Sequence, residues 1–163
     1  MGTSARLPAL SGKPIRVSIR RSLGPHLAST FLRRRLIFLD AEVLARRGDF
    51  ERILVHELFH FVWIRLSNAA RRDWERILVR EFARSARGEL GWSAERRKRK
   101  LSTLDAKSRG KAWRLYACES FCDTAAWRFA GLKSHAEFTL SPASARARRA
   151  WFDQQLGAGP LLV

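Results

Sequence analysis

The segment His56-Glu57-Leu58-Phe59-His60 constrains this chain more than any other feature of its sequence. It lies in an apolar stretch whose key residues recur at three- and four-residue steps, which indicates a helix running from about Phe50 to Ser67. On a helix, residues four apart lie on one face, so both imidazoles can reach the same cation. Two histidines and a glutamate on a largely buried helix would be costly without a purpose.

This pattern predicts a zinc site. Zinc accepts imidazole nitrogens and leaves one coordination position open in catalytic sites. Glu57 is rotated by about 100° from His56 on the helix, which places it near a water on the metal rather than on the metal itself. Such a water is far more acidic than bulk water, and Glu57 could take its proton as a general base. The alternative is that His56 and His60 are core histidines satisfied by hydrogen bonds, with Glu57 exposed or paired to an arginine.

A zinc site of this kind needs a third protein ligand. The residues from Lys111 to Gly131 form another predicted helix, and it carries Glu119 and Asp123 on one face in an apolar setting. We expect Glu119 to bind one zinc ion per chain together with His56 and His60. Asp123 would accept the other ring N–H of one histidine and so fix its tautomer.

The two cysteines, Cys118 and Cys122, lie on the same predicted helix. Their spacing is a poor geometry for a mutual disulfide, so we expect reduced thiols. Together with the two motif histidines they could form a closed Cys2His2 structural site, which would leave Glu57 without a role. Small buried cysteines are the simpler interpretation.

A zinc hydrolase also benefits from a donor that stabilises the developing oxyanion. Tyr116 lies one turn before Glu119 and could point into the cleft, or it could be a packed aromatic. His135 is an equal candidate, or a structural loop histidine. The sequence does not choose between them.

The remaining pattern predicts a single, mostly helical α+β domain over residues 1–163, with residues 1–13 flexible. Alternating apolar residues predict strands over Pro14–Arg21 and Arg33–Asp40, which would make a small N-terminal sheet. Further helices are expected over Arg71–Arg87 and residues 143–155. The polar stretch from Glu95 to Arg109 reads as a helical turn or two followed by a mobile loop.

The chain is strongly basic: 32 Lys and Arg face 15 Asp and Glu, which gives a net charge of +17. Such a charge permits binding to nucleic acid, although the basic runs are spread along the chain. If nucleic acid is bound, the stretch from Glu95 to Lys111 is the expected contact or lid. No apolar run suggests a secretion signal or a membrane span, so we expect a cytoplasmic protein. The sequence does not indicate an oligomeric state.

The H-E-L-F-H helix, preceded by R-R-L-I-F-L-D and followed by E-S-F-C-D, resembles the zincin metallopeptidases, and the gluzincin branch most closely. The resemblance covers about Leu36 to Phe129. It implies a zincin-like fold, His56, His60 and Glu119 as zinc ligands, Glu57 as general base and Asp123 beside a ligand. It also implies that Leu36–Leu39 is the edge strand that aligns a peptide substrate.

Two other interpretations stay open. SprT-like proteases, which are basic and act near DNA, use a histidine as third ligand, and His135 is the one candidate for it here. From a different class, the chain could be a basic nucleic-acid-associated protein with a structural or vestigial zinc site. The function expected from the resemblance is hydrolysis of peptide or protein substrates by a small intracellular zinc metallopeptidase.

Overall fold

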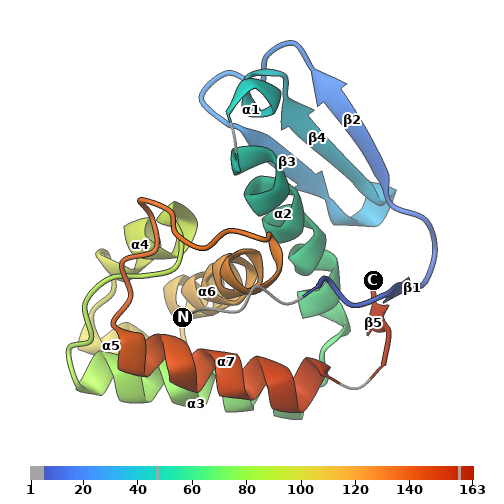
Figure 1. Cartoon of the computed structure of the whole chain (residues 1–163). Coiled ribbons are helices and arrows are strands. Elements are labelled where there is room, and N and C mark those ends of the chain that lie inside the picture. The colour runs from blue at the N-terminus through green and yellow to red at the C-terminus, as the bar shows by residue number, and fades with distance from the viewer. Residues whose placement is uncertain (1–5, 47, 158) are drawn as a thin grey trace.

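The computed structural model describes residues 6–46, 48–157 and 159–163, and its fold is the expected mostly helical α+β arrangement. A three-stranded sheet lies at one end of the molecule, and helices make up the rest (Figure 1). Its elements are β1 (Leu10–Ser11), β2 (Arg16–Arg20), β3 (Ala28–Phe31), the 3-10 helix η1 (Leu32–Arg34), β4 (Leu36–Asp40), α1 (Glu42–Ala45), α2 (Asp49–Arg65), α3 (Asn68–Ala83), α4 (Trp92–Lys98), α5 (Thr103–Ser108), α6 (Lys111–Phe129), α7 (Pro142–Leu156) and β5 (Leu161–Leu162).

The helix boundaries follow local signals in the sequence. The Ser67 hydroxyl accepts the Ala70 N–H and caps α3. Ser102 and Asp105 form a reciprocal capping box at the start of α5. Helix α6 ends before Gly131, whose φ of +80° is a left-handed conformation that favours glycine. The stretch from Glu95 to Arg109, expected to be a helical turn or two followed by a mobile loop, contains the end of α4 and all of α5.

The central helix α2 packs against α6, and together they organise the core. Phe59 of α2 contacts Phe121 and Phe129 of α6, with ring centroids 5.8 and 5.5 Å apart. Phe152 of α7 stacks on Phe121 at 5.1 Å, and Trp74 of α3 meets Phe152 at 5.6 Å. This aromatic core fixes the distance between the two helices that carry the predicted ligands.

The sheet has the order β2-β4-β3, with β2 parallel and β3 antiparallel to β4. The sequence-based assignment of Leu36–Leu39 to the edge is therefore wrong, because these residues belong to the central strand β4. Ile37 and Leu39 are fully buried, as expected for a strand with neighbours on both sides. The antiparallel edge strand next to α2 is β3, whose small and polar residues gave no clear strand pattern.

The N-terminal stretch is partly structured. Strand β1 pairs in parallel with β5, so Leu10 and Ser11 lie beside Leu161 and Leu162. Leu10 and Ser11 thus form a strand within the stretch 1–13 that was expected to be flexible, and residues 1–5 lie outside the described residues. Within the described ranges, every helix is too short or too polar to cross a lipid bilayer.

A buried ion network joins α3, α6 and α7, and no local pattern in the sequence indicated it. Arg148 is fully buried and contacts Glu81 and Glu89, each with a nitrogen–oxygen distance of 2.6 Å. The Tyr116 hydroxyl donates to Glu89 at 2.6 Å, and Lys98 lies 3.2 Å from the same carboxylate. Burial on its own would raise the pKa of Glu89, but the charge and hydrogen bonds of Arg148, together with Lys98 and Tyr116, outweigh burial and lower the pKa.

Candidate metal centre

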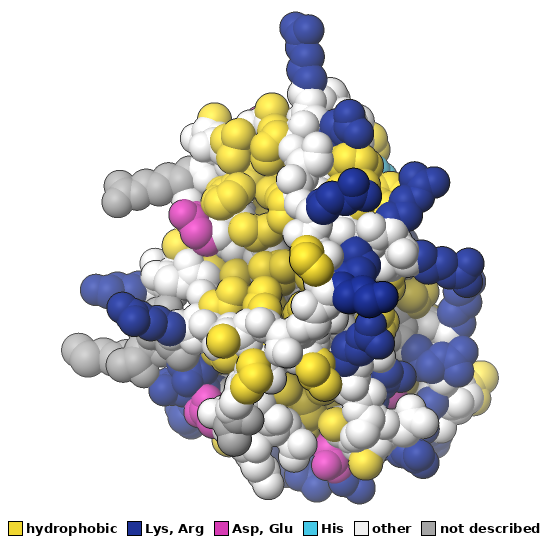
Figure 2. Space-filling model, turned by 90° about the vertical axis from the view of Figure 1, so that its right-hand side faces the viewer, with side chains coloured by type: hydrophobic (Ala, Val, Ile, Leu, Met, Phe, Trp, Pro, Cys, Tyr) yellow, Lys and Arg dark blue, Asp and Glu magenta, His cyan; other side chains and the backbone are white. Residues whose placement is uncertain are grey.

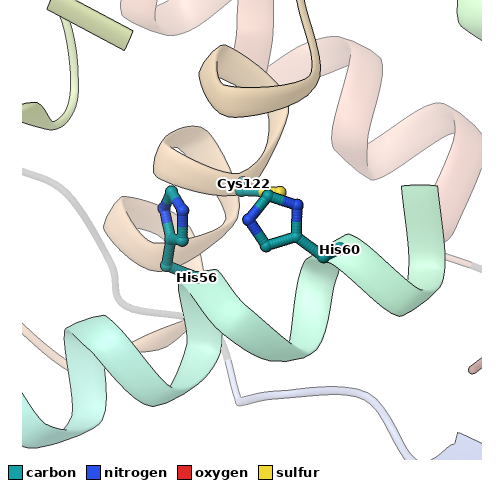
Figure 3. Close-up of side chains that lie close together, drawn as sticks. All are labelled: His56, His60 and Cys122. Atoms are coloured by element: carbon teal, nitrogen blue, oxygen red, sulfur yellow. The ribbon is translucent and has the colours of Figure 1, made fainter. Parts of the chain in front are cut away.

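The two motif histidines project from α2 toward α6, as the helical spacing predicted. Their ring centroids lie 5.1 Å apart. Cys122 points from α6 toward the same space (Figure 3). Donor atoms of His56, His60 and Cys122 all lie within 4.8 Å of one another, which makes this group a candidate metal-binding cluster.

His56 is held on both of its ring nitrogens by acids of α6. Its Nδ1 lies 2.7 Å from Asp123 Oδ1, and its Nε2 lies 3.2 Å from Glu119 Oε2. Two donors bound to one tetrahedral zinc at ~2.1 Å lie about 3.4 Å apart, so the second distance suits a shared ion. The structure therefore brings both acids to His56, with Glu119 beside Nε2 and Asp123 beside Nδ1.

Asp123 also connects the site to α4. Its Oδ2 accepts the Ala94 N–H at 2.8 Å, so the carboxylate lies at the N-terminus of that helix, where a negative charge is favoured. The close approach requires Gly91, because a Cβ there would come within 2.2 Å of the Asp123 carboxyl carbon. Asp123 is only 2% exposed, and its two carboxylate oxygens contact α4 and His56, one each.

His60 has a different partner, which the sequence analysis missed. Its Nδ1 lies 3.5 Å from Cys118 Sγ, so Cys118 occupies the ring nitrogen that Asp123 occupies on His56. Because this contact engages Nδ1, Nε2 is the ring nitrogen of His60 that a metal could use. It also gives the two cysteines different positions, with Cys118 beside His60 Nδ1 and Cys122 in the candidate cluster. A Cys2His2 site that uses both thiols is therefore disfavoured. The position of Cys118 next to Glu119 was the signal that could have suggested this role.

In this cluster, each histidine lies beside a group that can carry a negative charge. Burial would lower the pKa of His56, but the charge of Asp123 and hydrogen bonds to Asp123 and Glu119 raise it well above its usual value. Burial would raise the pKa of Glu119, but the hydrogen bond and charge of His56 lower it to about 2. A hydrogen bond from Cys122 lowers the pKa of Cys118 to about 6, against the effect of burial. The acids thus favour positive charge on the imidazoles.

A cleft of about 550 Å³ opens on one side of this cluster. Its lining includes His56 and Glu57 of α2, Trp92 and Arg96 of α4, and Ala28 at the start of β3. Glu57 Oε2 accepts a hydrogen bond from Thr30 Oγ1 at 2.5 Å, which ties the predicted general base to the edge strand. The cleft therefore gives access to one predicted ligand and to the predicted base.

The two candidates for oxyanion stabilisation lie elsewhere. Tyr116 is 1% exposed and its hydroxyl donates to Glu89, so of the two interpretations the structure has the packed aromatic. His135 contacts Asp49 at the first turn of α2, with a distance of 3.2 Å. That turn is seven residues from His56, about 10 Å along the helix, so His135 is not placed as a third ligand.

The residues whose donor atoms lie within 4.8 Å of one another are His56, His60 and Cys122, and Glu119 is tied to this group by its contact with His56. The expected set of two histidines and Glu119 consists of groups that zinc accepts. It combines two kinds of donor: imidazole nitrogens whose other ring nitrogens already have a hydrogen-bond partner, and a carboxylate whose pKa is low.

Comparisons with protein-family models, curated proteins and solved structures gave no match to this chain.

Proposed function

We propose that this chain is a zinc-dependent metallopeptidase, with His56, His60 and Glu119 as the ligands and Glu57 as the general base. The observation that carries the proposal is the position of His56 between Asp123 and Glu119, at the wall of a cleft that Glu57 also lines. Zinc bound there would act as a Lewis acid toward a carbonyl oxygen and would acidify a water.

The residues of the chain supply the remaining parts of the reaction. Glu57 would take a proton from a water in the cleft and pass it to the departing amine. Thr30 holds the Glu57 carboxylate through one oxygen and leaves the other available. Asp123 keeps the Nδ1 of His56 as its own hydrogen-bond partner, so Nε2 is directed toward the ligand position.

Strand β3 supports a peptide as the substrate. It is an edge strand of the sheet, and Ala28 at its start lines the cleft. An extended peptide can add to such an edge through main-chain hydrogen bonds, which would lay a scissile bond across Glu57. This mode of binding recognises the peptide backbone. Any preference for particular substrate side chains would come from the residues that line the cleft.

The test compares wild type with Glu57→Gln and with Glu51→Gln, an exposed control on the same helix. Metal analysis should find about one zinc per chain in all three proteins. Wild type and the control should cleave an unstructured protein substrate at equal rates. Loss of the general base should lower kcat at least ~100-fold in Glu57→Gln. A folded wild type that takes up no zinc, or a fully active Glu57→Gln, would refute the proposal.

A further inference from the structure

The outer face of the three-stranded sheet is the face that α2 does not cover. Because side chains alternate along a strand, buried Ile37 and Leu39 of β4 face α2, and Leu36 and Phe38 face the other way. The registers place Phe31 of β3 beside Leu36 on this outer face. Phe31 is 42% exposed, so an aromatic ring is presented to solvent on an uncovered sheet.

Arginines border these rings. Strand β2 places Arg16 beside Leu36, and Arg20 lies four residues further along the strand, on the same face. The Arg20 guanidinium lies 4.3 Å from the centroid of the Phe38 ring, and Phe38 meets Phe31 edge to face at 5.5 Å. Stacking on Phe38 holds a positive charge beside the exposed ring.

The positive charge of this region is not neutralised by the protein. Between residues 13 and 40 the sequence has seven basic side chains and one carboxylate, the basic ones being Lys13, Arg16, Arg20, Arg21, Arg33, Arg34 and Arg35. The carboxylate is Asp40, which is 6% exposed and accepts the N–H groups of Leu23 and Glu42. Within the described ranges Arg16 and Arg20 have no acidic partner.

The other basic stretch differs in this respect. From Glu95 to Lys111, four basic side chains are engaged in ion pairs with acids of the chain, namely Arg97, Lys98, Arg99 and Arg109. That pairing weakens the case for this stretch as the contact with an anionic polymer. Figure 2, viewed from the side of β2, shows apolar side chains with Lys and Arg gathered along one border and few acids.

We propose that the outer face of the sheet binds single-stranded nucleic acid, with a base stacked on Phe31 and phosphates held by Arg16 and Arg20. Exposed aromatic rings on a sheet are a platform for unpaired bases, and unpaired arginines supply the contact to the backbone. Duplexes keep their bases stacked inside and offer no face to such a ring. An anionic lipid surface would instead favour long aliphatic side chains on the face, and here Leu36 is partly buried.

The experiment measures binding of a fluorescently labelled single-stranded oligonucleotide of mixed sequence to the full chain, by anisotropy at several salt concentrations. Phe31→Leu keeps an apolar side chain but removes the ring, and Phe31→Tyr keeps the ring. One stacked base corresponds to a roughly 5- to 150-fold change in Kd. We expect Phe31→Leu to weaken binding by a factor in this range and Phe31→Tyr to bind like wild type.

Two matched controls separate a specific face from general attraction to a basic protein. The double reversal Arg16→Glu with Arg20→Glu is compared with Arg72→Glu and Arg146→Glu, which are exposed on α3 and α7, and the sheet pair should lose far more affinity. Trp92→Ala removes another exposed aromatic, on α4, and should have no effect.

Equal loss in both charge-reversal pairs, or no effect of Phe31→Leu, would overturn the proposal in favour of nonspecific attraction. Loss in Trp92→Ala with none in Phe31→Leu would move the site to α4 and overturn it as well. Tighter binding to phosphatidylserine vesicles than to the oligonucleotide, lost in Phe31→Leu, would identify a lipid surface instead. Binding should persist in a metal chelator, so the result is independent of the proposed peptidase activity.

Discussion

Replacing Arg148 by methionine tests how strongly the buried ion network stabilises the fold. Methionine keeps an unbranched apolar side chain at this buried position, but it is shorter than arginine and removes the guanidinium, whose carbon lies 5.7 Å from the centroid of the Trp74 ring. The substitution leaves Glu81 and Glu89, which are 6% and 0% exposed, without their main cation. Lys98 and Tyr116 still contact Glu89, so this carboxylate keeps part of its compensation.

Removing one partner of a buried ion pair costs about 3–5 kcal/mol, because the remaining charge stays out of water. We therefore expect the free energy of unfolding to fall by about 3–5 kcal/mol, a large part of the ~5–15 kcal/mol typical of a domain. Urea denaturation followed by tryptophan fluorescence measures this loss. Arg146→Met, on the exposed side of the same helix, is the control and should change stability by less than ~0.5 kcal/mol.

A second variant distinguishes the unpaired charge from lost packing. Adding Glu89→Gln to Arg148→Met removes one of the two carboxylates that have lost their cation, so it should recover part of the lost stability. A loss below ~1 kcal/mol in Arg148→Met would show that water or a rearranged side chain compensates the acids. No recovery in the double variant would show that packing, rather than charge, dominates the loss.

Two further predictions concern the metal centre. In the metal-free protein the raised pKa of His56 stabilises the fold at pH values below its unfolded value of ~6.5, and this stability is lost as pH rises through the folded value. Zinc must displace that proton, so its affinity in a chelator competition should fall about tenfold per pH unit below the folded pKa; a pH-independent affinity would contradict this. Gly91→Ala should cost about 1–3 kcal/mol in urea denaturation because its Cβ meets the pinned Asp123 carboxylate. Gly110→Ala, where the nearest atom is 3.4 Å away, is the control, and equal losses would refute the clash.

The parts of the site that the sequence predicted are those set by local spacing. The four-residue interval in the motif put His56 and His60 on one face of α2, and the same interval put Glu119 and Asp123 on one face of α6. Both helices are apolar around these residues, so each helix buries this face against the other. That packing brings the two pairs of residues together. The contact of Asp123 with His56 was expected on that basis and is present.

The parts that could not be predicted depend on partners distant in the chain. Tyr116 shares a helix face with Glu119, and only the position of Glu89, 27 residues away, decides where its hydroxyl points. Arg148 is one of 32 basic residues, and nothing near it in the sequence marks it as buried. Strand β3 lacks large alternating side chains, and it forms because β4 offers it an antiparallel edge.

The ion network and the candidate metal centre both involve α6 and α4, and this gives the buried charges a consequence for the site. Helix α6 carries Tyr116, whose hydroxyl is fixed by Glu89, and one turn later Glu119, which faces His56. Helix α4 is held at one end by Asp123 and further along by Lys98, which contacts Glu89. Glu89 therefore fixes the positions of α6 and α4 relative to each other, and Asp123 lies between α4 and His56. A loosened network should shift the donor atoms of the site before it unfolds the chain, because metal ligands tolerate displacements of only a few tenths of an ångström.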